Sequence, residues 1–202
     1  MTTVFIISAP SGSGKSTLTA RLLASDPALL FSVSYTTRRA RRNEKDGQSY
    51  RFVERTDFER MIANDEFLEW AQVYGNYYGT HRGILEEARR TSCDVVLDID
   101  VQGARQLKSR IPDAVTVFIL PPSRQVLEER LRARGEDADD VIERRLREAA
   151  GEIRRYNDYD YVLINRDLVE SETVLTAIVR GERVRRTRIE DQIRPILATF
   201  ES

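Results

Sequence analysis

The chain is poor in the residues that build disulfides, zinc sites and thiol chemistry. Its 202 residues include one cysteine, Cys93, and one histidine, His81. A single cysteine excludes an internal disulfide and a cysteine-based zinc site, and the lone histidine argues against a Cys/His nucleophile pair. We therefore expect Cys93 to serve packing and assign His81 no proton role.

Long apolar runs and net charge are lacking as well. No apolar run approaches the roughly 20 residues of a membrane span, and no secretory signal pattern stands at the N-terminus. A cytoplasmic protein without a membrane partner is expected. The formal net charge is −1, so no global basic field attracts nucleic acid. An anionic ligand must therefore be held by a local site.

The pattern of apolar residues predicts the fold class. The hydrophobic fraction of 41% and the charged fraction of 32% fit one folded domain. Helical periodicity at about 16–25, 101–110, 123–133, 138–157 and 167–188 separates short apolar runs typical of strands. These runs are Val4–Ser8, Asp94–Asp98, Val115–Leu120 and Tyr161–Ile164. Alternating strands and helices predict an α/β fold with a central parallel sheet covered on both faces.

Two segments depart from this alternation. Residues 34–82 are rich in aromatics and turns, which predicts an α+β insertion of short antiparallel strands around a helix near 56–64. The core would then comprise residues 1–33 and 83–202. A charged stretch at about 125–150, containing Gly135, is typical of a mobile helical lid. For residues 183–202, an extra helix packing on the domain or on a partner stays open.

The most informative segment follows the first expected strand and opens a helical pattern, as a Walker A phosphate loop requires. It consists of Ala9, Pro10, Ser11, Gly12, Ser13, Gly14, Lys15, Ser16 and Thr17. Glycines let backbone N–H groups wrap a phosphate, and the helix N-terminus adds favourable potential for an anion. Lys15 can bridge the β- and γ-phosphates of ATP, and the Ser16 hydroxyl can ligate Mg²⁺. Ala9 stands where glycine is usual, which requires its φ to stay negative.

Further motifs, in order along the chain, narrow the class of phosphate acceptor. They are Ser32–Arg38 with Arg41 and Glu44, Gly47–Tyr50, Phe67–Ala71, Gly75–Thr80, Leu97–Gly103, Pro121–Ser123, Arg130–Gly135, Arg145 and Asn165–Leu168. From about residue 3 to 180 the sequence resembles the guanylate kinases, which are P-loop nucleoside-monophosphate kinases. The resemblance implies Mg²⁺-dependent transfer of the γ-phosphoryl group of ATP to GMP in purine metabolism.

The resemblance also implies roles for individual residues. Four would hold the GMP phosphate: Arg38, Arg41, Tyr50 and Tyr78. Four would face the guanine: Ser34, Glu69, Thr80 and Asp98. Mg²⁺ would lie near Ser16, Asp98 and Asp100, directly or through water. Arg130, Arg134 and Arg145 would be lid arginines closing over ATP, and Asn165 would lie near the adenine. Lys15, Arg38, Arg134 and Arg145 would act in catalysis.

The chemistry of these side chains supports the same assignment. A phosphate monoester suits planar guanidinium forks and hydroxyl donors. Guanine presents N1–H and N2–H₂ donors beside an O6 acceptor, which match a carboxylate such as Glu69 or Asp98 and a hydroxyl such as Ser34. Adenine has an acceptor at N1, so the same carboxylate would repel it.

Two rival interpretations stay open. A non-catalytic domain of the same fold could bind phosphorylated protein segments through the acceptor pocket, although the intact Gly14-Lys15-Ser16 argues against it. A related kinase could use a phosphorylated sugar, which Ser34, Glu69 and Asp98 disfavour. Asn43 and Glu136 depart from the family pattern, in the acceptor loop and the lid respectively. The sequence leaves the chain as a monomer or a homo-oligomer.

Overall fold

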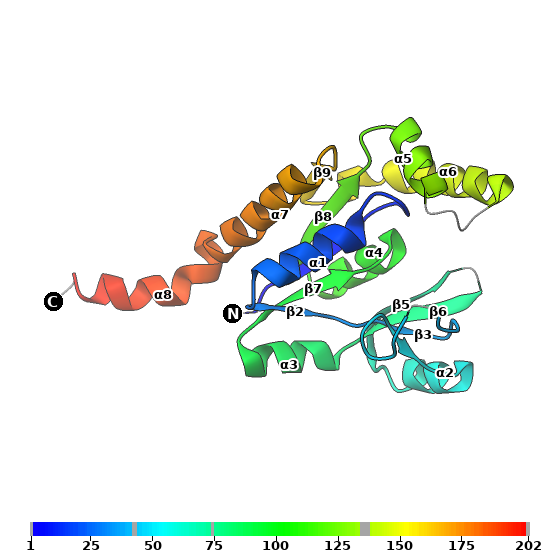
Figure 1. Ribbon diagram of the computed structural model, residues 1–202. Coiled ribbons are helices and arrows are strands. Elements are labelled where there is room, and N and C mark those ends of the chain that lie inside the picture. The colour runs from blue at the N-terminus through cyan, green and yellow to red at the C-terminus, as the bar shows by residue number, and fades with distance from the viewer. Residues whose placement is uncertain (1, 42–43, 74, 134–137, 201–202) are drawn as a thin grey trace.

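The computed structural model describes residues 2–41, 44–73, 75–133 and 138–200 (Figure 1). Its main sheet has five strands, all parallel, in the order β2-β7-β1-β8-β9. The four expected strands are confirmed, and the three-residue β2 is an addition that the sequence did not reveal. The strands are β1 (Val4–Ser8), β2 (Leu29–Phe31), β7 (Asp94–Asp98), β8 (Val115–Leu120) and β9 (Tyr161–Ile164).

Helices cover both faces of this sheet because its central strands are apolar on both sides. Phe5 and Ile7 of β1 face one core cluster, which α1 (Lys15–Ser25) and α7 (Leu168–Arg183) complete. Val4 and Ile6 face the other, under α3 (Gly83–Thr91) and α4 (Val101–Arg110). Alternation along one strand therefore feeds two separate cores.

A second sheet lies between β2 and α3 in the chain, within the expected insertion. Its order is β4-β3-β6-β5, with β3–β6 and β5–β6 antiparallel and β3–β4 parallel. Phe58 of the insertion helix packs with Met61 and Phe67 in a small core of the insertion. The elements are β3 (Tyr35–Thr36), β4 (Arg51–Phe52), α2 (Arg55–Ala63), β5 (Phe67–Val73) and β6 (Asn76–His81).

The expected lid region forms two helices, α5 (Arg124–Ala133) and α6 (Asp139–Ile153). They pack on each other through a separate cluster that includes Leu127, Leu131 and Leu146. In Figure 1 this pair lies on one side of the loop after β1, and the second sheet lies on the other side. The loop is therefore flanked by two units with cores of their own.

Two expected helices end earlier than their patterns suggested. The helix expected over 138–157 ends at Ile153, and a short 3₁₀ turn, Tyr156–Asp158, follows. The helix expected over 167–188 is two helices, α7 and α8 (Arg186–Ala198). Arg183 binds Asp26 and Asp94 at the end of α7, which fixes the break. Figure 1 shows α8 extending away from the sheet.

Within the described ranges, none of the helices is both long and apolar enough to cross a bilayer. The one cysteine, Cys93, is half-buried just before β7, and its thiol is 3.6 Å from the carbonyl oxygen of Thr91. His81 accepts a hydrogen bond from the Gly83 N–H at 3.1 Å. Cys93 and His81 therefore each contact the backbone of a residue two positions away in the sequence.

Candidate active site

The loop between β1 and α1 has the backbone geometry of a phosphate cradle. Gly12 and Gly14 have φ angles of 94° and 93°, which L-residues rarely adopt. Ala9 is not among the described non-glycine residues with positive φ, so it fits its position. Gly14 begins α1 without a side-chain cap. The first N–H groups of α1 therefore remain available for an anion.

Lys15 and Ser16 meet an acidic residue from the neighbouring strand. Ile7 of β1 is in register with Asp98 at the end of β7, so the loop and Asp98 share one edge of the sheet. The Lys15 ammonium pairs with the Asp98 carboxylate, and Ser16 Oγ lies 3.4 Å from Asp98 Oδ2. The structure thus brings three predicted residues into one cluster.

Two residues from the C-terminal half of the chain, Asn165 and Arg130, donate hydrogen bonds to the backbone of the phosphate loop. Asn165 is buried, and its side-chain amide donates to the Ser13 carbonyl oxygen at 2.8 Å. Arg130 donates to the Asn165 carbonyl oxygen at 3.0 Å and to that of Ser13 at 3.4 Å. A Cβ at Gly14 would lie 2.4 Å from Asn165 Nδ2, which leaves room for glycine alone. Asn165 thus contacts the loop itself, while its predicted contact with adenine stays a prediction.

Of the other two predicted lid arginines, the structure describes Arg145. Arg145 is half-buried on α6, on the face that also carries Glu148 and Glu152, because residues three and four apart share a helix face. Arg134, together with Gly135 and Glu136, lies outside the described residues.

Glu152 is a residue that the sequence analysis missed. It lines a cavity of about 710 Å³ together with Asp100 and Glu148. Burial and the nearby Asp100 carboxylate raise the pKa of Glu152 to about 7, while Lys15 opposes the rise. The spacing of Arg145, Glu148 and Glu152 could have indicated an inward charged stripe on α6.

The second sheet supplies a buried carboxylate. Glu69 of β5 is 4% exposed, and its Oε1 accepts a hydrogen bond of 2.6 Å from the Thr80 hydroxyl of β6. Burial raises the pKa of Glu69 to about 7, and Asp100 adds to the rise. Gly103 of α4 is so close that an added Cβ would lie 2.6 Å from Glu69 Oε2. Glu69 is therefore held between the insertion and the core.

A cationic and phenolic cluster lies on the same sheet. The Arg38 guanidinium carbon is 5.4 Å from the ring centre of Tyr50, and the Tyr50 and Tyr78 rings are 5.9 Å apart. Glu44 orients this group, accepting from Arg38 at 2.7 Å and from the Arg41 backbone N–H at 2.8 Å. The structure thus assembles Arg38, Tyr50 and Tyr78, with Arg41 exposed beside them.

Two further predicted residues occupy defined positions. Ser34 lies just before β3, where its carbonyl oxygen accepts from the Arg51 N–H at 2.9 Å. Asp100 caps α4, accepting from the Gly103 N–H at 2.8 Å. One Asp100 oxygen is therefore used structurally.

The residues near Lys15 fit a magnesium ion brought by a nucleotide. In the part of the chain that the structure describes, no three acidic, histidine or cysteine side chains are placed to hold a metal. Mg²⁺ in kinases commonly takes one or two carboxylates, with phosphate and water oxygens completing the shell. The Ser16 hydroxyl and the Asp98 carboxylate are hard oxygen donors of that kind. The site fits a metal that arrives with its phosphates.

The close approach of Gly103 to Glu69 gives a first prediction. Replacing Gly103 with alanine is expected to displace the Glu69 carboxylate, because the new methyl group would overlap Oε2. Loss of a charged hydrogen bond should lower kcat/KM for a guanine acceptor by at least ~10-fold. Gly181→Ala in α7 is the control, since an added Cβ there meets nothing within 4 Å. Equal steady-state kinetics in both variants would contradict the contact.

The raised pKa of Glu69 gives a second prediction, for the ligand-free protein. Between pH 4.5, its ordinary pKa, and about 7, the folded protein holds a proton that the unfolded chain has released. The free energy of unfolding therefore falls as pH rises through this range, by at most ~3 kcal/mol for Glu69. Glu69→Gln should lack this pH-dependent fall. The free energy of unfolding of Glu69→Gln, relative to that of wild type, should therefore rise from pH 5 to pH 8.

Urea unfolding of both proteins at several pH values measures this difference. Glu87→Gln, on the exposed side of α3, is the matched control. A stability difference between Glu69→Gln and wild type that does not vary with pH would refute the buried, proton-holding carboxylate.

The sheet order and the loop define the class, a P-loop protein with a second sheet inserted between β2 and α3. A family model described as Guanylate kinase matches residues 1–182. The guanylate kinase of Vibrio cholerae is 50% identical over 188 residues, covering 92% of this chain and 91% of that protein. That of Koribacter versatilis is 52% identical over 204 residues, covering 98% and 88%. The chain belongs to the guanylate kinase family.

A solved structure agrees with this placement. The crystal structure of guanylate kinase from Anaplasma phagocytophilum has a TM-score of 0.78 and 36% identity, and it covers 93% of this chain and 89% of that one. The family match ends before α8, which begins at Arg186.

Proposed function

We propose that this protein transfers the γ-phosphoryl group of ATP to GMP, giving ADP and GDP. The proposal is supported by two groups of polar side chains, one at the phosphate loop and one on the insertion sheet. The P-loop residues Lys15 and Ser16 meet Asp98 at the edge of the main sheet. The buried Glu69–Thr80 pair lies on the adjoining insertion sheet, packed against α4 of the core. Family membership supports the same reaction.

On the donor side, the loop Ala9–Thr17 holds the phosphates of ATP. Its backbone N–H groups and the start of α1 bind the β-phosphate, and Lys15 moves from Asp98 to the β,γ-bridge. Bound Mg²⁺ would supply charge neutralisation between the β- and γ-oxygens. Ser16 and Asp98 would hold it, with Asp100 reached through water. Arg130 keeps the loop in shape through Ser13 and Asn165.

On the acceptor side, the insertion over residues 34–82 binds GMP. Arg38, Tyr50 and Tyr78 already lie together and, with Arg41, bind the phosphate through planar and hydroxyl donors. Glu69 accepts from guanine N1–H and N2–H₂, and Ser34 serves O6. Thr80 orients Glu69. The guanine role of Asp98 fits its place between Lys15 and the insertion, where its charge also acts on Tyr50.

Catalysis in this proposal is positioning and charge stabilisation. A phosphate-monoester oxygen is already nucleophilic, so no general base is needed. Arg38 and Lys15, with the lid residues Arg134 and Arg145, offset the charge of the transferring group in a closed site. The lid over about 125–150 closes through the α5–α6 pair, whose core is separate from the sheet.

A coupled assay tests the proposal directly. ATP and Mg²⁺ are offered with GMP, AMP, CMP, UMP or ribose phosphates in parallel, and ADP formation is followed. We expect ADP formation with GMP, and we expect it to stop when Mg²⁺ is chelated. ADP formation with a sugar phosphate and not with GMP would show that the acceptor is a sugar phosphate. GMP binding without ADP formation would indicate a non-catalytic binding domain.

A further inference from the structure

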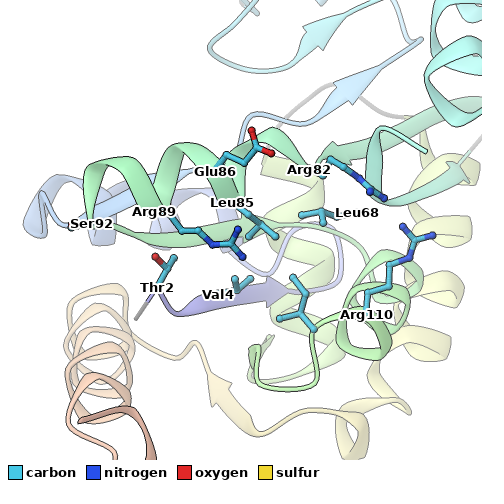
Figure 2. A pocket seen from close by; sticks show the side chains of 10 residues that line it. Thr2, Val4, Leu68, Arg82, Leu85, Glu86, Arg89, Ser92 and Arg110 are labelled. Atoms are coloured by element: carbon cyan, nitrogen blue, oxygen red, sulfur yellow. The ribbon is translucent and has the colours of Figure 1, made fainter. Parts of the chain in front are cut away.

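A large cavity among the described residues lies away from the P-loop. This cavity, the α3–α4 pocket, has a volume of about 840 Å³ and lies beside the start of β1 (Figure 2). The P-loop follows the other end of β1, at Ser8. None of the residues assigned above to ATP, GMP or Mg²⁺ lines the pocket.

The pocket has an apolar floor of a size that suits a small organic molecule. Val4, Leu68 and Leu85 contribute to this floor, and all three belong to the core cluster under α3 and α4 or pack against it. Ligand sites commonly measure about 300–1,000 Å³ and combine an apolar lining with a few polar groups.

Three arginines line the same pocket, two of them at α3 and one at the end of α4. Arg82 pairs with Asp65 at 2.7 Å, and Arg110, 3.7 Å from the same carboxylate, donates to the Phe67 carbonyl oxygen at 2.8 Å. Two guanidinium groups therefore share one exposed carboxylate. With Arg89, three arginines therefore face two carboxylates at the pocket, Asp65 and the lining residue Glu86.

Arg89 is the third arginine, and its guanidinium has no hydrogen-bond or ion-pair partner among the described residues. In the view of Figure 2 it extends between Leu85 and Val4, and Glu86 of the same helix also lines the pocket. A guanidinium beside apolar surface binds phosphate, carboxylate or sulfonate groups through its planar fork.

We propose that the α3–α4 pocket is a second binding site, for a small organic anion with an apolar body. The anionic group pairs with Arg89, and the apolar body lies on Val4, Leu68 and Leu85. The charge and the floor together favour such a molecule over a simple inorganic anion, which would leave the apolar floor exposed to water.

The pocket is connected to the acceptor side through β5. Leu68 lines the pocket, and the next residue, Glu69, contacts Thr80 and Gly103. Arg110 ties α4 to the same strand through the Phe67 carbonyl oxygen. An occupied pocket should therefore change KM for GMP more than KM for ATP, a coupling that rests on the proposed function.

Binding of anilinonaphthalene sulfonate, an aromatic anion that fluoresces in apolar sites, tests the proposal on the full chain. Arg89→Ala should weaken binding of this probe by about 10-fold, the scale of one charge-assisted hydrogen bond. Arg90→Ala is the matched control, since Arg90 is the next exposed arginine of α3 and does not line the pocket. A saturating mixture of ADP and GMP should change the affinity for the probe without abolishing its binding, because coupling between two sites is reciprocal.

Equal probe affinity in wild type and Arg89→Ala, or complete exclusion of the probe by saturating ADP and GMP, would overturn the site. Probe binding that leaves KM for GMP unchanged would overturn the coupling through β5. Fluorescence needs no turnover, so a chain that fails to phosphorylate GMP would refute the proposed function and still answer the question of the pocket.

Discussion

Replacing Lys15 with methionine is expected to lower kcat for ATP-dependent phosphorylation of GMP by at least ~10²-fold. The Lys15 ammonium lies at the first turn of α1, beside Asp98 and Ser16, where the β- and γ-phosphates of ATP would bind. Methionine keeps most of the side-chain length and removes the charge. A preorganised charge stabiliser of this kind contributes about 3–4 kcal/mol to the transition state.

GMP affinity separates this role from a general loss of folding. Titration calorimetry should give a similar affinity for GMP in Lys15→Met and wild type, because the acceptor residues other than Asp98 lie in the insertion over residues 34–82. Lys45→Met is the control, since Lys45 is an exposed lysine on that same insertion. Near-normal turnover by Lys15→Met would remove the assignment of the phosphate loop and would favour another phosphate site.

The second large effect concerns the choice of base. Wild-type protein is expected to prefer GMP over AMP by roughly 10⁴-fold in kcat/KM, because a buried site built to hydrogen-bond its substrate leaves groups unpaired with a mismatched one. AMP loses the bonds to Glu69 and directs the N1 lone pair toward its carboxylate. IMP keeps N1–H but lacks N2–H₂, so it should fall between the two.

Glu69→Gln tests whether this carboxylate reads the base. The amide retains the volume and an acceptor for the Thr80 hydroxyl, but it presents a donor to one of the guanine donors. Its kcat/KM for GMP should fall by at least ~10-fold, while ATP parameters stay near wild type. Glu87→Gln serves again as the control. Strong use of AMP by the wild type, or intact GMP kinetics in Glu69→Gln, would exclude the guanine-reading role.

Much of the fold could be predicted because buried parallel strands correspond to short apolar runs in the sequence. The runs at Val4–Ser8, Asp94–Asp98, Val115–Leu120 and Tyr161–Ile164 are strands with those same bounds. β2 was missed because three residues carry too little pattern. The helix α3 was missed because it is only nine residues long and fully buries only Ala88.

The phosphate loop could also be predicted in detail, since its chemistry depends on neighbours along the chain. Gly12 and Gly14 supply the positive φ angles, and Lys15 and Ser16 follow at the start of α1. The family resemblance added the acceptor residues, of which Arg38, Tyr50 and Tyr78 meet in one cluster. Their contacts with ligands remain predictions.

The class of fold, the phosphate loop and the family could thus be inferred from the order of residues alone. Which distant groups meet became known from the folded chain. It placed Asp98 on Lys15, Gly103 against Glu69, and Glu152 beside Asp100. Periodicity within one element records which of its side chains exclude water, but not which other element covers them. That choice depends on strand register and helix packing between residues far apart in the chain.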